Sequence, residues 1–315
     1  MTSLPHPIQY QGSKRNLASD ILRFLPNTVE RLVEPFSGTA AISIAASSKG
    51  ISQKFWINDL NKPLVELVEL IVEKPDEISN AYAEIWNEQQ EDSVKHFYEA
   101  RDKFNKSNNP KVFLYLLARC VKGAVRYNSK GLFNQSPDKR RKGTQPEKMR
   151  KNIEGVSRLL KGKCRFTYLD YRDVLAEVRN SDFVYIDPPY QGVCGNKDSR
   201  YSSGINFDNF VLALKELNQK GTSFVVSYDG KRGNKIFGNG LPEELGLKKI
   251  EIEVGRSSQA TLLGRQEITV ESLYLSPSLL RDRNLDLESY IIKAHKQIPL
   301  LKRHGQFSTA ASFTR

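Results

Sequence analysis

Residues 32–46, Leu-Val-Glu-Pro-Phe-Ser-Gly-Thr-Ala-Ala-Ile-Ser-Ile-Ala-Ala, join a short apolar strand pattern to a small-residue turn and then to a helix pattern. A second strand pattern at 54–57 ends at Asn58-Asp59. The next helix is expected to begin near Asn61, because Pro63 suits a first helical turn. Its apolar face carries, at helical spacing, Leu64, Leu67, Val68 and Ile71. Strands that alternate with helices in this way predict a parallel α/β sheet.

The later part of the chain continues this alternation. Strand patterns occur at 165–169, 183–186 and 224–227, and an amphipathic helix before the last of them carries Phe210, Leu212, Leu214 and Leu217. Residues 248–254 and 267–275 alternate polar and apolar side chains, which predicts an antiparallel pair at the end of the sheet. A further helix is expected over 279–296.

Residues 75–162 interrupt the alternation with helical patterns and a polar loop. We therefore expect a discontinuous sheet domain made of residues 1–61 and 161–275. The insertion at 62–160 is expected to be mostly helical. Residues 276–315 form a C-terminal extension to which the sequence assigns no function.

The composition predicts a globular protein with an anionic partner. Of 315 residues, 39% are hydrophobic and 27% are charged, which are globular values. The net charge of +12 at pH 7 favours a polyanion, although a basic protein can also simply be soluble. Three cysteines without paired spacing predict neither a metal site nor a disulfide framework, and therefore a reducing cytoplasm. No apolar run approaches membrane-spanning length, and no signal peptide is visible.

The strand pattern at 183–186 runs directly into Asp187-Pro188-Pro189-Tyr190. Each proline fixes φ near −65° and lacks an N–H, so the segment is rigid and rich in hydrogen-bond acceptors. A carboxylate and bare carbonyls beside an aromatic ring suit a flat ligand that donates hydrogen bonds, such as the amino group of a base. The alternative is a strand-ending turn with a packed tyrosine.

Three other features also follow strand patterns: the turn at 36–39, Asp59 and Asp170. Ligands of open α/β sheets bind outside the carboxyl ends of the strands, so these residues are expected to share a site. A small-residue turn exposes backbone N–H groups to a ligand. Asp59 follows Phe36 by 23 residues, which resembles the spacing of ribose-binding acids. Each feature alone could be an ordinary helix cap.

The insertion carries the heaviest basic load. Residues 139–163 include ten Lys or Arg against two Glu, and the first four, Lys139, Arg140, Arg141 and Lys142, are consecutive. Just before them lie base-reading side chains, Arg126, Asn128, Asn134 and Gln135, and two rings able to stack, Tyr127 and Phe133. A charge run is usually a solvated face. The combination with forked side chains and rings favours nucleic acid.

The ordered motifs together resemble the Dam-like, α-group (D12 class) family of DNA adenine-N6 methyltransferases, which use S-adenosylmethionine. The motifs are, in order, YQGSKRNLASDIL, VEPFSGTAAI, WINDLN, RYNSKGLFN, YLDYRDVL, DFVYIDPPY and FVVSYDG. The resemblance implies a Rossmann-like methyltransferase sheet, which makes the sheet domain catalytic. It also makes the insertion a target-recognition domain that binds DNA through the residues named above.

The same resemblance assigns site residues. Contacts to the methionine end of the cofactor are implied for Tyr10, Gly12 and Lys14, and pocket-lining positions for Glu34, Phe36 and Gly38. Asp59 should hold the ribose, and Asp170 and Tyr171 should flank the adenine. The implied catalytic residues are Asp187, Pro188 and Tyr190. The sequence departs from the family at Ala40, where the family often has glycine. The sequence therefore does not determine the backbone geometry of that turn.

The implied activity is site-specific transfer of a methyl group to N6 of adenine in double-stranded DNA. Asp187 and the Pro188 carbonyl would accept the amino hydrogens and stabilise positive charge on the nitrogen during in-line transfer. Tyr190 would stack on a base flipped out of the duplex, and residues 191–206 would form a mobile flap. The setting would be the cytoplasm of a prokaryote, or a phage. A monomer or weak dimer is expected, either with a cognate restriction endonuclease or as an orphan methylase.

Four alternatives stay open from the residues alone. A cytosine-N4 methyltransferase more often carries serine at position 187, and a protein-glutamine methyltransferase favours asparagine there. An RNA adenine methyltransferase would share the basic insertion. A catalytically silent DNA-binding module is a fourth interpretation, against which Asp59, Asp187 and Tyr190 argue.

Overall fold

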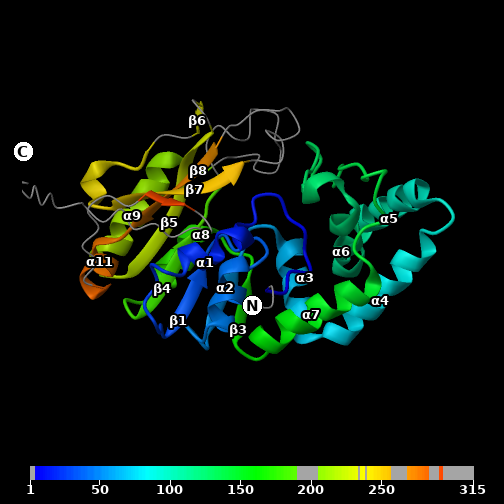
Figure 1. The fold of residues 1–315 in the computed structure, drawn as a ribbon, viewed down its shortest axis with the longest axis horizontal. Helices are drawn as coiled ribbons and strands as arrows, with labels where there is room; N and C mark the ends of the chain where they lie inside the picture. Colours follow the sequence, from blue (N-terminus) through cyan, green and yellow to red (C-terminus); the bar gives the residue numbers. More distant parts are fainter. Residues whose placement is uncertain are drawn as a thin grey trace, which may run out of the picture.

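The computed structural model describes residues 4–189, 205–232, 235–237, 240–256, 268–283 and 291–293. Within these residues one sheet has nine strands, in the order β3-β2-β1-β4-β5-β8-β7-β9, with β6 beside β5 (Figure 1). The parallel strands are β1 (Arg31–Glu34), β2 (Phe55–Asn58), β3 (Cys164–Thr167), β4 (Asp182–Ile186) and β5 (Ser223–Arg232). The predicted α/β sheet is therefore confirmed.

Strands β7 and β8 form an antiparallel pair towards the far end of the sheet, as their alternating sequences predict. Strand β8 (Ile268–Leu275) pairs with both β5 and β7 (Lys248–Arg256), and the short β6 (Lys235–Phe237) pairs with β5. Because β8 runs opposite to β5, its first residues lie near the carboxyl end of β5. Residue Glu271 pairs with Gly230 there.

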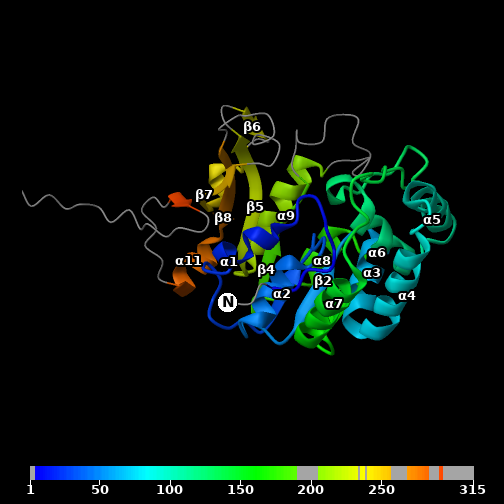
Figure 2. The ribbon, with the colours of Figure 1, turned by 45° about the vertical axis from the view of Figure 1, so that its right-hand side comes forward.

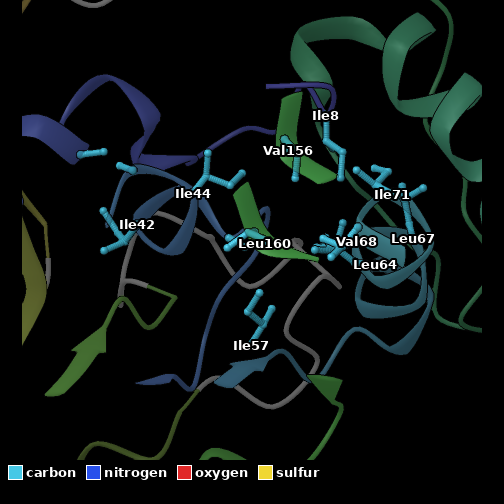
Figure 3. Close-up of a cluster of buried hydrophobic side chains, with 14 of the residues drawn as sticks. Ile8, Ile42, Ile44, Ile57, Leu64, Leu67, Val68, Ile71, Val156 and Leu160 are labelled. Carbon is cyan, nitrogen blue, oxygen red and sulfur yellow. The ribbon is translucent and has the colours of Figure 1, made fainter. Parts of the chain in front are cut away.

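Helices cover both faces of the sheet, and alternate strand residues point to each. One face carries α1 (Ala18–Ile21), α2 (Ala41–Ser48), α3 (Lys62–Glu73) and α7 (Pro146–Leu160). Figure 3 shows apolar side chains of the N-terminal segment, α2, β2, α3 and α7 gathered in one cluster. The opposite face packs on α8 (Tyr171–Glu177) and α9 (Phe207–Gln219). The predicted apolar face of α3 is confirmed, because its four residues are all buried.

One detail of α9 is wrong in the sequence interpretation. Leu212 is 55% exposed, whereas Phe210, Ala213, Leu214 and Leu217 are buried. Positions i, i+3, i+4 and i+7 share a helix face, and a residue two positions along the helix lies on nearly the opposite side.

The insertion is helical, with α4 (Pro75–Glu88), α5 (Ser93–Ser107) and α6 (Pro110–Arg119). Figures 1 and 2 show these three helices grouped beyond α3 and α7, away from the sheet. A continuous cluster of buried apolar side chains runs from the sheet through α3 and α7 into α4, α5 and α6. Within this cluster, the buried side chains show no break near residues 62 and 160, where the domain boundaries were expected. Those boundaries therefore stay a prediction.

The helix expected over 279–296 is wrong. Helix α11 (Pro277–Arg283) is short, and Ile291–Lys293 forms strand β9, parallel to β7. The β-branched Ile291 and Ile292 favour a strand, and the open edge of β7 supplies backbone partners for it. No helix in the described part of the chain is long and apolar enough to cross a membrane.

Candidate active site

A cavity of about 550 Å³ opens at the carboxyl ends of the parallel strands. It is lined by nearly all the residues predicted to be catalytic or to bind the cofactor, namely Tyr10, Gly12, Lys14, Glu34, Phe36, Gly38, Asp59, Asp170, Tyr171, Asp187 and Pro188. These residues come from five separate segments of the chain. Tyr190 and most of the expected flap, residues 191–204, lie outside the described residues.

The turn after β1 lines the cavity, and the backbone N–H groups of Ser37, Gly38 and Ala40 in it donate hydrogen bonds to acceptors inside the protein. Gly38 has a φ of 51°, and its N–H donates to Asp59 Oδ2 at 2.9 Å. The other oxygen, Oδ1, accepts the N–H of Asn61 at 2.9 Å. Burial raises the pKa of Asp59, and these two hydrogen bonds oppose the rise. Asp59 therefore organises the turn and the start of α3 in addition to facing the cavity.

The departure at Ala40 is resolved by its backbone. Ala40 adopts the left-handed conformation, with φ 55° and ψ 37°, and its side chain is fully buried. This conformation costs an alanine about 1–2 kcal/mol. The turn therefore keeps the geometry that a glycine would favour, and the buried core holds the alanine in it.

Glu34, at the end of β1, is 2% exposed and accepts hydrogen bonds from the backbone N–H and the hydroxyl of Ser43 in α2. Burial raises the pKa of Glu34 to about 7. The Ser43 hydrogen bonds oppose this shift, and the negative charge of Asp187 adds to it. The Glu34 carboxyl group therefore ionises less readily than that of an exposed glutamate.

Asp187 meets a buried lysine rather than open solvent. Lys14 lies on the short 3₁₀ helix η1 (Lys14–Asn16), and its Nζ is 2.9 Å from Asp187 Oδ1. The same Nζ is 3.4 Å from Glu271 Oε2. The ammonium of Lys14, expected at the methionine end of the cofactor, thus also contacts the expected catalytic carboxylate.

The opposite wall of the cavity is aromatic. The rings of Phe36 and Tyr171 lie 5.2 Å apart at an interplanar angle of 32°. Asp170 caps α8 by accepting the N–H of Arg172 at 2.9 Å. The Arg172 guanidinium also holds the pKa of Asp170 below its usual range. A flat, apolar surface beside a carboxylate suits a heteroaromatic base that carries an amino group.

The charge of the cavity is opposite to that of the protein. Five carboxylates line it, against two cationic side chains: the acids are Glu34, Asp59, Asp170, Asp187 and Glu271, and the cations are Lys14 and Arg172. The whole chain has a net charge of +12. An acidic cavity in a basic protein suits a cationic small ligand together with a polyanionic partner. S-adenosylmethionine, a sulfonium compound with a nucleoside, fits this cavity in charge and chemistry.

Among the lining residues to which the sequence analysis gave no role, two bring polar groups to the cavity from segments without a motif: Glu271 and Asn209. Asn209 lies in the first turn of α9, and Ile205 and Asn206, the last two residues of the expected flap, line the cavity just before that helix. Glu271 carried a weak signal, because it replaces an apolar residue on a strand face that otherwise buries Leu273 and Leu275.

The N-terminal segment of the site is held by the insertion. The N–H of Gln11 donates to the carbonyl of Gly123 at 3.0 Å. Gly123 has a φ of +60°, and a Cβ there would lie 2.6 Å from the carbonyl oxygen of Gln9. Only glycine leaves room for the backbone of Gln9 to lie this close to residue 123. This close contact places Tyr10, Gly12 and Lys14 against the end of α6.

We therefore expect Gly123→Ala to lower the affinity for S-adenosylmethionine by about tenfold or more, since overpacking of this kind typically costs about 1–3 kcal/mol. Isothermal calorimetry measures the effect. The control is Gly162→Ala, because Gly162 has a φ of +72° with open space around it. Equal affinities for the two variants would contradict the proposed link.

Residues 126–134 form a hairpin next to this contact. Tyr127 and Phe133 pair across it, and the N–H of Asn134 donates to the carbonyl of Arg126 at 3.0 Å. The tip is closed by Asn128, whose Oδ1 accepts the N–H groups of Lys130 and Leu132 at 2.9 and 3.0 Å. In this structure the side-chain oxygen of Asn128 therefore shapes the turn. Only the NH₂ group of the same side chain stays available to contact a base.

The structure contradicts a DNA contact for Phe133. Its side chain is 1% exposed and packs edge-on against Phe104 and Phe113, with ring centroids 5.9 Å away from each. Asn105 of α5 holds its backbone through two hydrogen bonds. The apolar interior of the insertion is filled by this ring, which a motif alone could not reveal.

The other predicted DNA contacts lie at or near the surface. Arg126 and Asn134 are exposed, as are Lys139, Arg140, Arg141 and Lys142. Tyr127 is half-buried, and its hydroxyl is 3.4 Å from Asn61 Oδ1, so it joins the hairpin to the start of α3. Burial raises the pKa of Tyr127 to about 12. Leu132, at the tip, is 40% exposed.

Comparisons with known proteins indicate the family of the chain. The family model described as "D12 class N6 adenine-specific DNA methyltransferase" matches residues 10–253. The chain is 27% identical to the type II methyltransferase M.MjaIII of Methanocaldococcus jannaschii over 266 residues, 77% of this chain and 89% of that protein. It is 26% identical to the type II methyltransferase M1.LlaDCHI of Lactococcus lactis over 278 residues, 83% and 92% of the two chains. The DNA adenine methylase of Escherichia coli K12 is 30% identical over 188 residues, 58% of this chain and 64% of that protein.

Proposed function

The chain belongs to the D12 class of N6 adenine-specific DNA methyltransferases, and from this premise we propose how its residues carry out the reaction. The class methylates adenine at N6 in DNA, and S-adenosylmethionine, when bound, supplies an electrophilic methyl group. The assignment to adenine in DNA separates this chain from the cytosine-N4, RNA and glutamine alternatives. The observation that best supports the proposed binding mode is the acidic cavity, because a sulfonium cation gains from its five carboxylates.

Asp187 and Pro188 are proposed to hold the target amino group. The carbonyl of Pro188 and a carboxylate oxygen of Asp187 would each accept one N–H of the adenine. Both acceptors gain strength as positive charge grows on the nitrogen, so they stabilise the transition state more than the ground state. Tyr190 is proposed as the stacking partner of the flipped base, from its place in the sequence.

The cofactor is proposed to lie along the turn after β1, in contact with the N-terminal loop. Tyr10, Gly12 and Lys14 would face its methionine end, and Asp59 would accept the ribose hydroxyl groups. Glu34, Phe36 and Gly38 would line the centre, with Asp170 and Tyr171 beside the adenine. The course of the turn along the cavity and the aromatic wall support this order.

We expect Asp59→Ala to weaken S-adenosylmethionine binding by at least about tenfold, as expected for a lost charge-assisted hydrogen bond of about 1.5–3 kcal/mol. Affinity for bare DNA should stay within about twofold. Because Asp59 also orders the turn, Asp59→Asn serves as the control, since its amide oxygen can still accept the Gly38 N–H. Calorimetry showing unchanged cofactor affinity in Asp59→Ala would contradict the ribose assignment.

DNA is proposed to bind as a duplex across the insertion, with residues 62–160 acting as the target-recognition domain. The basic run from Lys139 to Lys142 would contact phosphates, and the hairpin would approach the bases with its exposed Arg126, Asn134 and tip. Flipping the adenine would bring it from this surface into the adjoining cavity. A cognate restriction endonuclease is a proposed partner, since two relatives are named type II methyltransferases. A monomer or weak dimer in the prokaryotic or phage-infected cytoplasm remains our proposal.

The test is to incubate the protein with S-adenosylmethionine and unmethylated genomic DNA, and then to map modified bases by sequencing. We expect N6-methyladenine at one short recurring sequence. Methylation of cytosine, or of adenine without sequence preference, would contradict the proposal. RNA of the same sequence is the control substrate.

A further inference from the structure

Glu271 places a charge on a strand face that is otherwise apolar. On β8, Leu273 and Leu275 point to the same face and are buried with Val225, Ile250 and Ile252. A carboxylate in such a row is costly unless cations or donors surround it. Its position near the carboxyl end of β5 brings it to the cavity, which it lines.

One ammonium group joins Glu271 to the expected catalytic carboxylate. Lys14 is 7% exposed, and its Nζ contacts Asp187 Oδ1 at 2.9 Å and Glu271 Oε2 at 3.4 Å. Ser227, in the middle of β5, places its hydroxyl 3.5 Å from the same Glu271 oxygen. Lys14 lies in η1, Asp187 directly follows β4, and Glu271 lies in β8, so the three charged groups meet only in the folded protein.

We propose that Glu271 is a positioning residue for methyl transfer, which holds the Lys14 ammonium at one oxygen of Asp187 so that the other oxygen is presented to the target amino group. The proposal rests on the catalytic role of Asp187 given above. Glu271 itself contacts neither the amino group nor the transferred methyl. It acts through Lys14.

A lysine needs such an anchor because its side chain has four flexible torsions. With Glu271 in place, the ammonium is shared between two anions, so Asp187 keeps more of its negative charge for the substrate. With Glu271 neutral, Lys14 is free either to leave Asp187 or to neutralise it fully. In both cases the acceptor that stabilises the developing charge becomes weaker or misplaced.

The competing interpretation is that Glu271 merely balances a buried lysine. That role would affect folding stability, since removing one partner leaves an uncompensated charge. It would leave the chemical step of the folded enzyme unchanged. The two interpretations are therefore separated by turnover measured on folded protein, together with cofactor affinity.

The experiment compares Glu271→Gln, Glu271→Asp, Lys14→Met and the double variant Lys14→Met/Glu271→Gln. The control is Glu253→Gln, because Glu253 lies on the neighbouring strand β7 and is not among the residues that line the cavity. We measure kcat and KM on a duplex with the target site, S-adenosylmethionine affinity by calorimetry, and thermal unfolding.

We expect Glu271→Gln to lower kcat by about 10- to 100-fold, the scale of a misplaced reacting group, with KM and cofactor affinity changed less than about threefold. Glu271→Asp should recover part of the loss. In the Lys14→Met background the same Glu271 change should alter kcat less than about twofold, because residues that act through one another are not additive.

Three outcomes would overturn the proposal. These are wild-type kcat in Glu271→Gln, fully additive losses in the double variant, and a loss confined to thermal stability. A wild-type protein without methyltransferase activity would count against the proposed function. An active wild-type protein together with an unchanged kcat in Glu271→Gln would count against this inference alone.

Discussion

Asp187→Asn is expected to lower kcat by about 10²-fold or more, because an electrostatic contact that strengthens in the transition state normally contributes on that scale. The asparagine keeps the size and one carbonyl oxygen of the side chain but loses the charge. It therefore weakens the acceptor that opposes positive charge on the adenine nitrogen. The measurement is single-turnover transfer of a labelled methyl group to a duplex that contains the target site.

The loss should be confined to the chemical step. In this variant Lys14 keeps the carboxylate of Glu271 as a partner at 3.4 Å, so we expect only a small change in S-adenosylmethionine affinity and in thermal unfolding. The control is Asp173→Asn, because Asp173 is exposed on α8 and is not among the described residues that line the cavity. A variant that retained more than about a tenth of wild-type turnover would refute the catalytic role.

Neutralising Lys139, Arg140, Arg141 and Lys142 together is expected to weaken binding to every duplex alike. These side chains are exposed, and Asp138 lies 3.7 Å from Arg140 Nε and 3.6 Å from Arg141 Nε. Each phosphate contact that is lost should flatten the dependence of log affinity on log salt by up to ~0.9. Fluorescence anisotropy over a series of salt concentrations measures both quantities.

The matched control removes four exposed basic residues in the connections that lead into β2, β3 and β4, namely Lys49, Lys54, Lys161 and Arg179. The overall charge then changes equally, but binding should weaken far less. A second comparison uses Arg126→Ala, which should reduce binding to the target site by about 1–3 kcal/mol more than to random DNA. If the basic-run variant changes this preference and Arg126→Ala does not, the two roles are reversed.

Much of the fold and of the site could be predicted because both depend on local sequence. Strand patterns that alternate with helix patterns imply parallel strands, and parallel strands end at one edge of the sheet. Asp59 and Asp187 each follow such a strand, so their convergence on one cavity followed from topology. Glycine at position 38 and the rigid prolines after Asp187 also act through their own backbone geometry.

The remaining features depend on contacts between segments that are distant in the sequence, and only the tertiary structure decided them. Phe133 resembles a stacking ring, yet the interior of the insertion buries it. The sequence alone gives no reason to single out Gly123, whose role depends on its contact with Gln9. Likewise, the role of Glu271 depends on its contact with Lys14, which lies near the other end of the chain. A one-dimensional pattern records which face a side chain takes on its own element. It carries no information about which other element packs there, because that choice is made by the packing of the whole core.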